Sequence, residues 1–117
     1  MNNVVCDLSQ RKCVPCEGGV PKLTESELKP LLAGLAEWEL KSNPMRIYKR
    51  YSFKDFYHTM AFVNAIAWVA NSENHHPDLE VGYNYCAVSY HTHAIDGLSE
   101  NDFICAAKIE QLLNPAT

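Results

Sequence analysis

Long apolar runs are missing from this sequence. The longest one lies within residues 60–70 and is interrupted by Asn64, so it is shorter than the roughly 20 residues that a membrane-spanning helix requires. Basic clusters are missing as well, since Lys and Arg occur at most in pairs and the formal net charge is −4. The sequence therefore predicts neither a membrane protein nor a direct binder of nucleic acid.

Targeting and disulfide patterns are also absent. The first residues contain neither a basic stretch nor an apolar core, so we expect a cytoplasmic location. The five cysteines are an odd number, and Cys86 and Cys105 lie in apolar segments, which favours reduced thiols over a disulfide framework. Cys13 and Cys16 have the spacing of a redox motif, but no strand precedes them and no helix follows. We therefore interpret this pair as structural or incidental.

The 117 residues are typical of one domain. Residues 1–22 contain prolines and glycines that prevent regular pairing, so we predict an N-terminal arm over 1–22 and a folded domain over 23–117. Apolar positions three and four residues apart predict three helices, one after the capping-box sequence at 24–27, a long one over 53–70 and one over 99–113. Alternating patterns predict four strands, near 38–41, 47–53, 79–83 and 85–92.

This order of elements predicts an α+β fold in which three helices pack on one face of a four-stranded antiparallel sheet. Pro30 lies inside the first helix and predicts either a kink there or a regular helix only from Pro30 onward. The helix over 53–70 carries more apolar positions than one contact with a sheet requires, so we expect one side of it to pack against another subunit.

Four of the five histidines lie in two short segments. His75 and His76 are adjacent just after the long helix, and His91 and His93 flank the end of a strand. Imidazole can give and take a proton near neutral pH, so such a cluster suits acid–base catalysis. The same residues could instead be polar connections that face solvent, or could bind zinc, although adjacent histidines reach one ion poorly. Common hydrolase and nucleotide-binding motifs are absent.

The residues around these histidines resemble the signature of the pterin-4a-carbinolamine dehydratases. The sequence Asn74-His75-His76-Pro77 is followed at the family's spacing by Tyr83, His93 and Asp102, and the similarity extends over residues 22–113. Residues 13–21 also resemble the N-terminal extension that is common in bacterial members. The resemblance implies a single α+β domain that forms homodimers or homotetramers and uses no metal or organic cofactor.

The resemblance also implies a reaction, the dehydration of 4a-hydroxytetrahydrobiopterin to quinonoid dihydrobiopterin, which recycles the pterin cofactor of aromatic amino-acid hydroxylases. By the family pattern His75, His76 and His93 are the catalytic residues. His75 and His93 are the acid–base pair, and His76 binds and orients the pterin and helps to stabilise charge as it develops. Substrate contacts are expected at Asn74, His75, His76, His91, Thr92, His93 and Ala94. Asp102 is expected to cap the last helix and to bias the tautomer of His93. Tyr83 is expected to pack on the sheet, where it could also wall the pocket.

Two other functions stay open. Animal relatives also act as dimerisation cofactors of a homeodomain transcription factor, so the resemblance allows a non-catalytic, coactivator-type binding module that uses the helix over 53–70. Asn71 and Asn74 stand where charged residues are common in the family. Loss of negative charge beside the histidines would make their protonated form less populated, which would suit a catalytically silent member.

Overall fold

The computed structural model describes residues 8–14 and 21–113 of the chain. Its elements are helix α2 (Glu25–Ala33), strands β1 (Glu39–Lys41) and β2 (Arg46–Ser52), helix α3 (Phe56–Glu73), strands β3 (Asp78–Val81) and β4 (Tyr85–Tyr90), the 3₁₀ turn η1 (His93–Ile95) and helix α4 (Glu100–Leu113). The predicted α+β fold with three α-helices and four antiparallel strands is confirmed. None of the helices described here is both long and apolar enough to cross a membrane.

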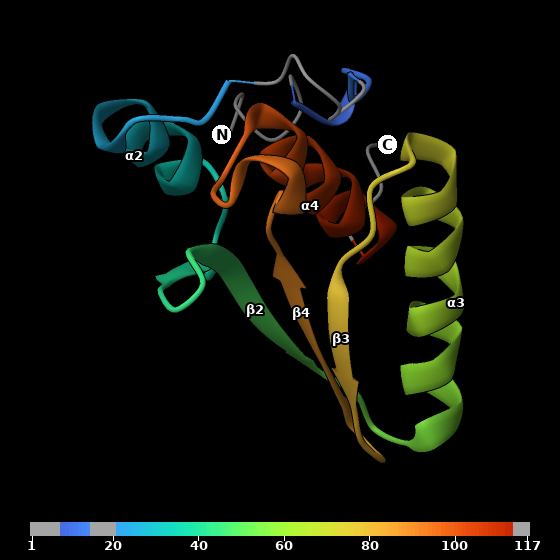
Figure 1. The fold of residues 1–117 in the computed structure, drawn as a ribbon. Helices are drawn as coiled ribbons and strands as arrows, with labels where there is room; N and C mark the ends of the chain where they lie inside the picture. Colours follow the sequence, from blue (N-terminus) through green and yellow to red (C-terminus); the bar gives the residue numbers. More distant parts are fainter. Residues whose placement is uncertain (1–7, 15–20, 114–117) are drawn as a thin grey trace.

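The sheet has the strand order β1-β2-β4-β3, and each neighbouring pair is antiparallel. In the central pair, Ile47 lies opposite Tyr90 and Tyr51 opposite Cys86. These four side chains are buried, because α3 and α4 lie on the same side of the sheet (Figure 1). The side chains of residues 48, 50 and 52 of β2 point to the other face of the sheet and are at least partly exposed, as the alternation of a strand requires.

Local capping explains where the helices begin. In α2 the Thr24 backbone N–H donates to Glu27 at 2.8 Å, so the predicted capping box is formed. The helix runs through Pro30, so the expectation that regular helix starts only at Pro30 is wrong. Helix α3 begins at Phe56 rather than near residue 53, because the Asp55 side chain accepts the backbone N–H of His58 at 2.8 Å.

A polar cluster on the core side of the sheet joins α4 to β2 and to the residue that precedes β1. One oxygen of Glu110 accepts hydrogen bonds from Lys49 Nζ at 2.7 Å, Tyr51 OH at 2.6 Å and Trp38 Nε1 at 3.0 Å. Burial alone would raise the pKa of Glu110, but these hydrogen bonds, led by the one from Lys49, outweigh it and lower the pKa. The carboxylate therefore stays charged and holds α4 to β2.

The described part of the predicted arm packs against α4. Leu8 is buried in the core. The backbone N–H of Val14 donates to Asn101 Oδ1 at 3.1 Å, and Asn101 Nδ2 donates to the Val14 carbonyl at 2.8 Å. Arg11 forms an ion pair with Glu100 at 2.8 Å. These contacts fasten residues 8–14 to the first half of α4, whereas Cys16 lies outside the described residues.

Candidate active site

The end of α3 turns His75 towards the protein interior. Asn74 adopts a left-handed conformation (φ 52°), which ends the helix, and the His75 backbone N–H closes the last turn on the Ala70 carbonyl at 3.1 Å. Pro77 follows and has no N–H with which to continue a helix. As a result His75 is 7% exposed, while the neighbouring His76 faces solvent.

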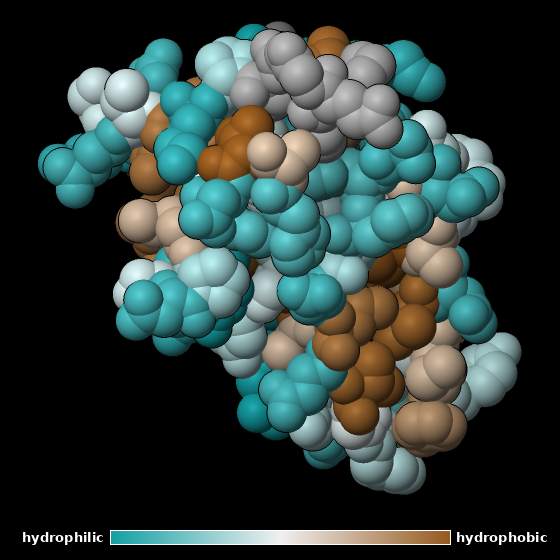
Figure 2. Space-filling model, viewed as in Figure 1, coloured by the Kyte–Doolittle hydropathy of each residue, from teal (hydrophilic) through white to brown (hydrophobic). Residues whose placement is uncertain are grey.

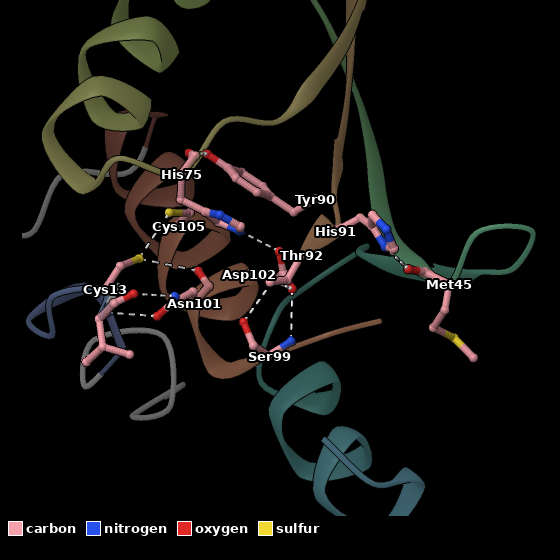
Figure 3. Close-up of polar contacts among 11 residues, drawn as sticks. Cys13, Met45, His75, Tyr90, His91, Thr92, Ser99, Asn101, Asp102 and Cys105 are labelled. Carbon is pink, nitrogen blue, oxygen red and sulfur yellow. Dashed lines mark hydrogen bonds and ion pairs between the residues drawn. The ribbon is translucent and has the colours of Figure 1, made fainter. Parts of the chain in front are cut away.

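The ring of His75 is held from two directions (Figure 3). Its Nε2 lies 2.6 Å from Asp102 Oδ1 on α4, and its face stacks on Tyr90 of β4 with ring centroids 5.2 Å apart. An ionised carboxylate can only accept, so Nε2 carries the proton in this contact. A proton exchanged between this ring and a ligand would therefore pass through Nδ1.

Asp102 is fully buried and accepts two further hydrogen bonds. Its Oδ2 accepts from Thr92 Oγ1 at 2.7 Å and from the Ser99 backbone N–H at 2.9 Å. The contact with Ser99 is the carboxylate half of a capping box, as the sequence predicts. We expected Asp102 to fix the tautomer of His93. Among the described residues, the histidine ring that bonds to this carboxylate is instead that of His75, so Asp102 fixes the tautomer of His75.

The second histidine segment leaves the end of β4. The alternation of the strand continues past Tyr90, so Thr92 is buried near Asp102, and its N–H pairs with the Gly97 carbonyl at 2.9 Å. The turn η1 then begins with His93, which is exposed. The ring of His91 meets that of His93 edge-on, with centroids 4.7 Å apart. His91 Nδ1 donates to the Met45 carbonyl at 2.8 Å, since a carbonyl oxygen can only accept.

These two segments enclose one pocket of about 260 Å³. Its lining includes every residue for which the resemblance implies a substrate contact, together with Pro77 and Asp78, for which it implies none: Asn74, His75, His76, Pro77, Asp78, His91, Thr92, His93 and Ala94. Tyr83 does not line it, since it lies in the turn between β3 and β4 and is 65% exposed. The contacts of Met45 and Tyr90 with the imidazoles are also absent from the sequence-based prediction.

A larger cavity of about 710 Å³ lies between the arm, α3 and α4. It contains no histidine, and its charged residues include Lys108 and Glu73, which pair with each other at 3.7 Å. We therefore regard the smaller, histidine-lined pocket as the candidate active site. Within residues 8–14 and 21–113, no three His, Cys, Asp or Glu side chains are grouped so that they could hold a metal ion.

Comparison with known proteins shows the family to which the chain belongs. The sequence model of the family described as "Pterin 4 alpha carbinolamine dehydratase" matches residues 21–112. The chain belongs to this family. Two curated relatives are each called "Putative pterin-4-alpha-carbinolamine dehydratase". The one from Nitrosomonas eutropha is 61% identical over 93% of this chain and 96% of its own length. The one from Legionella pneumophila is 58% identical over 92% of this chain and 96% of its own length.

Solved structures of pterin dehydratase relatives share the fold. A Brucella melitensis protein described as a transcriptional coactivator/pterin dehydratase superposes with a TM-score of 0.75 at 32% identity, over 79% of this chain and 98% of that one. A pterin dehydratase-like protein described as a RuBisCO assembly factor of the α-carboxysome superposes with a TM-score of 0.58 at 25% identity, over 68% and 93% of the two chains. Members of this fold are thus described with more than one role.

Proposed function

We propose that this protein catalyses the dehydration of 4a-hydroxytetrahydrobiopterin to quinonoid dihydrobiopterin, a step that recycles the pterin cofactor of aromatic amino-acid hydroxylases. The observation that carries the proposal is the meeting of His75 and His76 with His91 and His93 around one pocket. The pocket volume of about 260 Å³ is just under the roughly 300 Å³ at which typical small-molecule sites begin. This size suits a bicyclic heterocycle better than a larger nucleotide.

The reaction requires two proton transfers. The C4a–O bond breaks as the hydroxyl takes a proton and leaves as water, while N5 loses its proton and the N–H electron pair becomes part of the C4a=N5 bond. His75 suits the role of base, because the Asp102 carboxylate stabilises the imidazolium form that the ring adopts after it takes a proton. His93, from the other segment, then serves as the acid towards the leaving hydroxyl.

The remaining residues of the pocket bind the substrate in this proposal. His76 orients the pterin, and Asn74, Thr92 and Ala94 contribute contacts. Because His91 Nδ1–H donates its hydrogen bond to the Met45 carbonyl, Nε2 is the ring nitrogen that could accept a hydrogen bond from a ligand. No metal or organic cofactor takes part in the proposed reaction, since proton transfer by imidazoles is sufficient for a dehydration of this kind.

The proposal is tested by following the decay of the carbinolamine with and without the protein. We expect His75→Ala and His93→Ala to lower kcat/KM by about 10²–10⁴, the usual contribution of a general acid or base. His58→Ala is the matched control, because His58 pairs with Asp55 at the start of α3 and does not line the pocket. A wild-type protein that leaves the decay rate unchanged would instead identify a catalytically silent member of the family.

A binding role is the second candidate, and the surface of α3 favours it. Phe56, Tyr57 and Trp68 are 50%, 77% and 73% exposed, and Figure 2 shows hydrophobic residues gathered over α3 and β3. All residues of β3, an edge strand, are exposed. We propose that these surfaces form a homodimer or homotetramer, which sedimentation would measure.

A coactivator-type module would lose partner binding on Trp68→Ala and keep it on His75→Ala. A dehydratase would lose activity on His75→Ala and keep it on Trp68→Ala.

A further inference from the structure

Two thiols that the proposed dehydration does not use lie together beside the active site. Cys13 belongs to the arm and Cys105 to α4, and their Sγ atoms are 3.5 Å apart (Figure 3). Both are free cysteines. We infer that Cys13 and Cys105 form an oxidation site, at which an oxidant of the peroxide class converts the two thiols to a disulfide and so locks the arm onto α4.

The backbone around Cys13 is held in place independently of the sulfur atoms. The Cys13 N–H donates to Glu73 Oε1 on α3 at 2.8 Å, and the next residue, Val14, forms the two hydrogen bonds with Asn101 described above. Cys105 lies one helical turn after Asn101 on α4. A disulfide needs an S–S distance of about 2.05 Å, so the sulfur atoms must approach by about 1.5 Å from where they stand. Small side-chain rotations can supply a movement of this size.

The chemistry balances with hydrogen peroxide as the oxidant. Peroxide first converts the Cys13 thiol to a sulfenic acid and releases one water. The Cys105 sulfur then attacks the Cys13 sulfur, which forms the S–S bond and releases the second water. The two thiols together lose two protons and two electrons, and the O–O bond of the peroxide is reduced. Cys13 reacts first because it is only partly buried, whereas Cys105 is fully buried.

The environment of Cys13 makes this site slow at neutral pH. The hydrogen bond with Cys105, followed by burial, raises the pKa of the Cys13 thiol, so little thiolate is present to attack peroxide. The rate of disulfide formation is therefore expected to increase as the pH rises. A site that oxidises this slowly responds to prolonged exposure to peroxide rather than to a brief one.

The Cys13–Cys105 disulfide would form close to the proposed active site. Asn101, which holds the arm, precedes Asp102, which holds His75. A cavity of about 290 Å³ formed by residues 12–14 and 72–74 shares Asn74 with the histidine-lined pocket. The cross-link spans 92 residues and so restricts the unfolded chain strongly. We expect the thermal midpoint of the oxidised protein to rise by several degrees.

The test treats the full chain with hydrogen peroxide between pH 7 and pH 9, blocks the remaining thiols and digests with trypsin and chymotrypsin. In a Cys16→Ser variant, the expected product joins fragment 13–22 to fragment 104–108 and is two hydrogens lighter than their sum. The rise in thermal midpoint should disappear on reduction. Cys86→Ser is the matched control, because Cys86 is a buried free thiol on β4, and this variant should form the same cross-link.

Three results would overturn the inference: a Cys13–Cys16 disulfide as the main wild-type product, Cys13 sulfinic acid without any cross-link, or an equal rise in thermal midpoint in Cys13→Ser. A serine places a polar hydroxyl in the part-buried contact with α4, so Cys13→Ala and Cys105→Ala repeat the test, and their midpoints in the reduced state show that they fold. Neither the peptide masses nor the thermal midpoint depends on pterin turnover, so this test can fail while the proposed dehydration holds, and the reverse is also possible.

Discussion

The substitution Asp102→Asn probes the contact on which the proposed base depends. It removes the charge of the buried carboxylate and replaces one oxygen by an amide nitrogen. The carboxylate accepts from His75 Nε2 on Oδ1 and from both Thr92 Oγ1 and the Ser99 N–H on Oδ2. An amide has a single acceptor oxygen. We expect this oxygen to remain with the two donors of Thr92 and Ser99, which leaves the amide nitrogen facing His75.

The size of the effect follows from this geometry. An amide nitrogen can only donate, so the His75 ring must accept at Nε2 and carry its proton on Nδ1, the reverse of the wild-type tautomer. Loss of a hydrogen bond to a charged group costs about 1.5–3 kcal/mol in the free energy of unfolding. This loss is less than the roughly 5–15 kcal/mol stability of a typical domain, so the variant should fold. With the base in the wrong tautomer, kcat should fall by about 10²–10⁴, while KM changes little.

Three measurements decide the outcome: the rate of carbinolamine decay, urea unfolding, and the ¹⁵N chemical shifts of the His75 ring, which report its tautomer. Asp55→Asn is the matched control. Asp55 Oδ1 lies 2.7 Å from His58 Nδ1 in a partly exposed pair outside the pocket, and Asn preserves the helix cap. Its kcat should equal that of the wild type. If the Asp102→Asn variant keeps the wild-type kcat and the His75 ring keeps its proton on Nε2, then Asp102 does not position His75 for catalysis.

Two further substitutions test the support of the fold and of the pocket. Because the pKa of Glu110 lies below its usual 4.5, this residue stabilises the fold fully above about pH 4.5 and progressively less as the pH falls through the lowered value. Glu110→Gln should lower the free energy of unfolding by about 1.5–3 kcal/mol at pH 7 and flatten its decline in acid, as measured by urea titrations. His91→Asn places an amide N–H near the position of Nδ1 and so retains the bond to the Met45 carbonyl, but it lacks Nε2. Steady-state kinetics should show a raised KM with a smaller change in kcat, and an unchanged KM would contradict the proposed binding role of His91.

Local chemistry made several parts of the fold predictable from the sequence. The capping box at Thr24 and the alternation along β4 are encoded within a few neighbouring residues. Only one of the two roles of Asp102 is encoded by residues close to it in the sequence. Its position three residues after Ser99 indicates a helix cap, but its contact with His75 joins residues 27 apart in the chain. Spacing could not decide which histidine segment would reach α4, because this depends on how α3 and α4 pack on the sheet.

The convergence of the two histidine segments follows from the hairpin between them. In an antiparallel pair the start of one strand lies beside the end of the other, and here Asp78 of β3 pairs with Ser89 of β4. Extending this register outward brings the residues just before β3 beside those just after β4, so His76 and His91 reach the same end of the sheet. The same geometry excludes Tyr83, since the turn lies at the opposite end of the hairpin, five residues or roughly 16 Å from Asp78 at 3.3 Å per residue. A site proposed from separate motifs can therefore be checked against strand register before any side chain is placed.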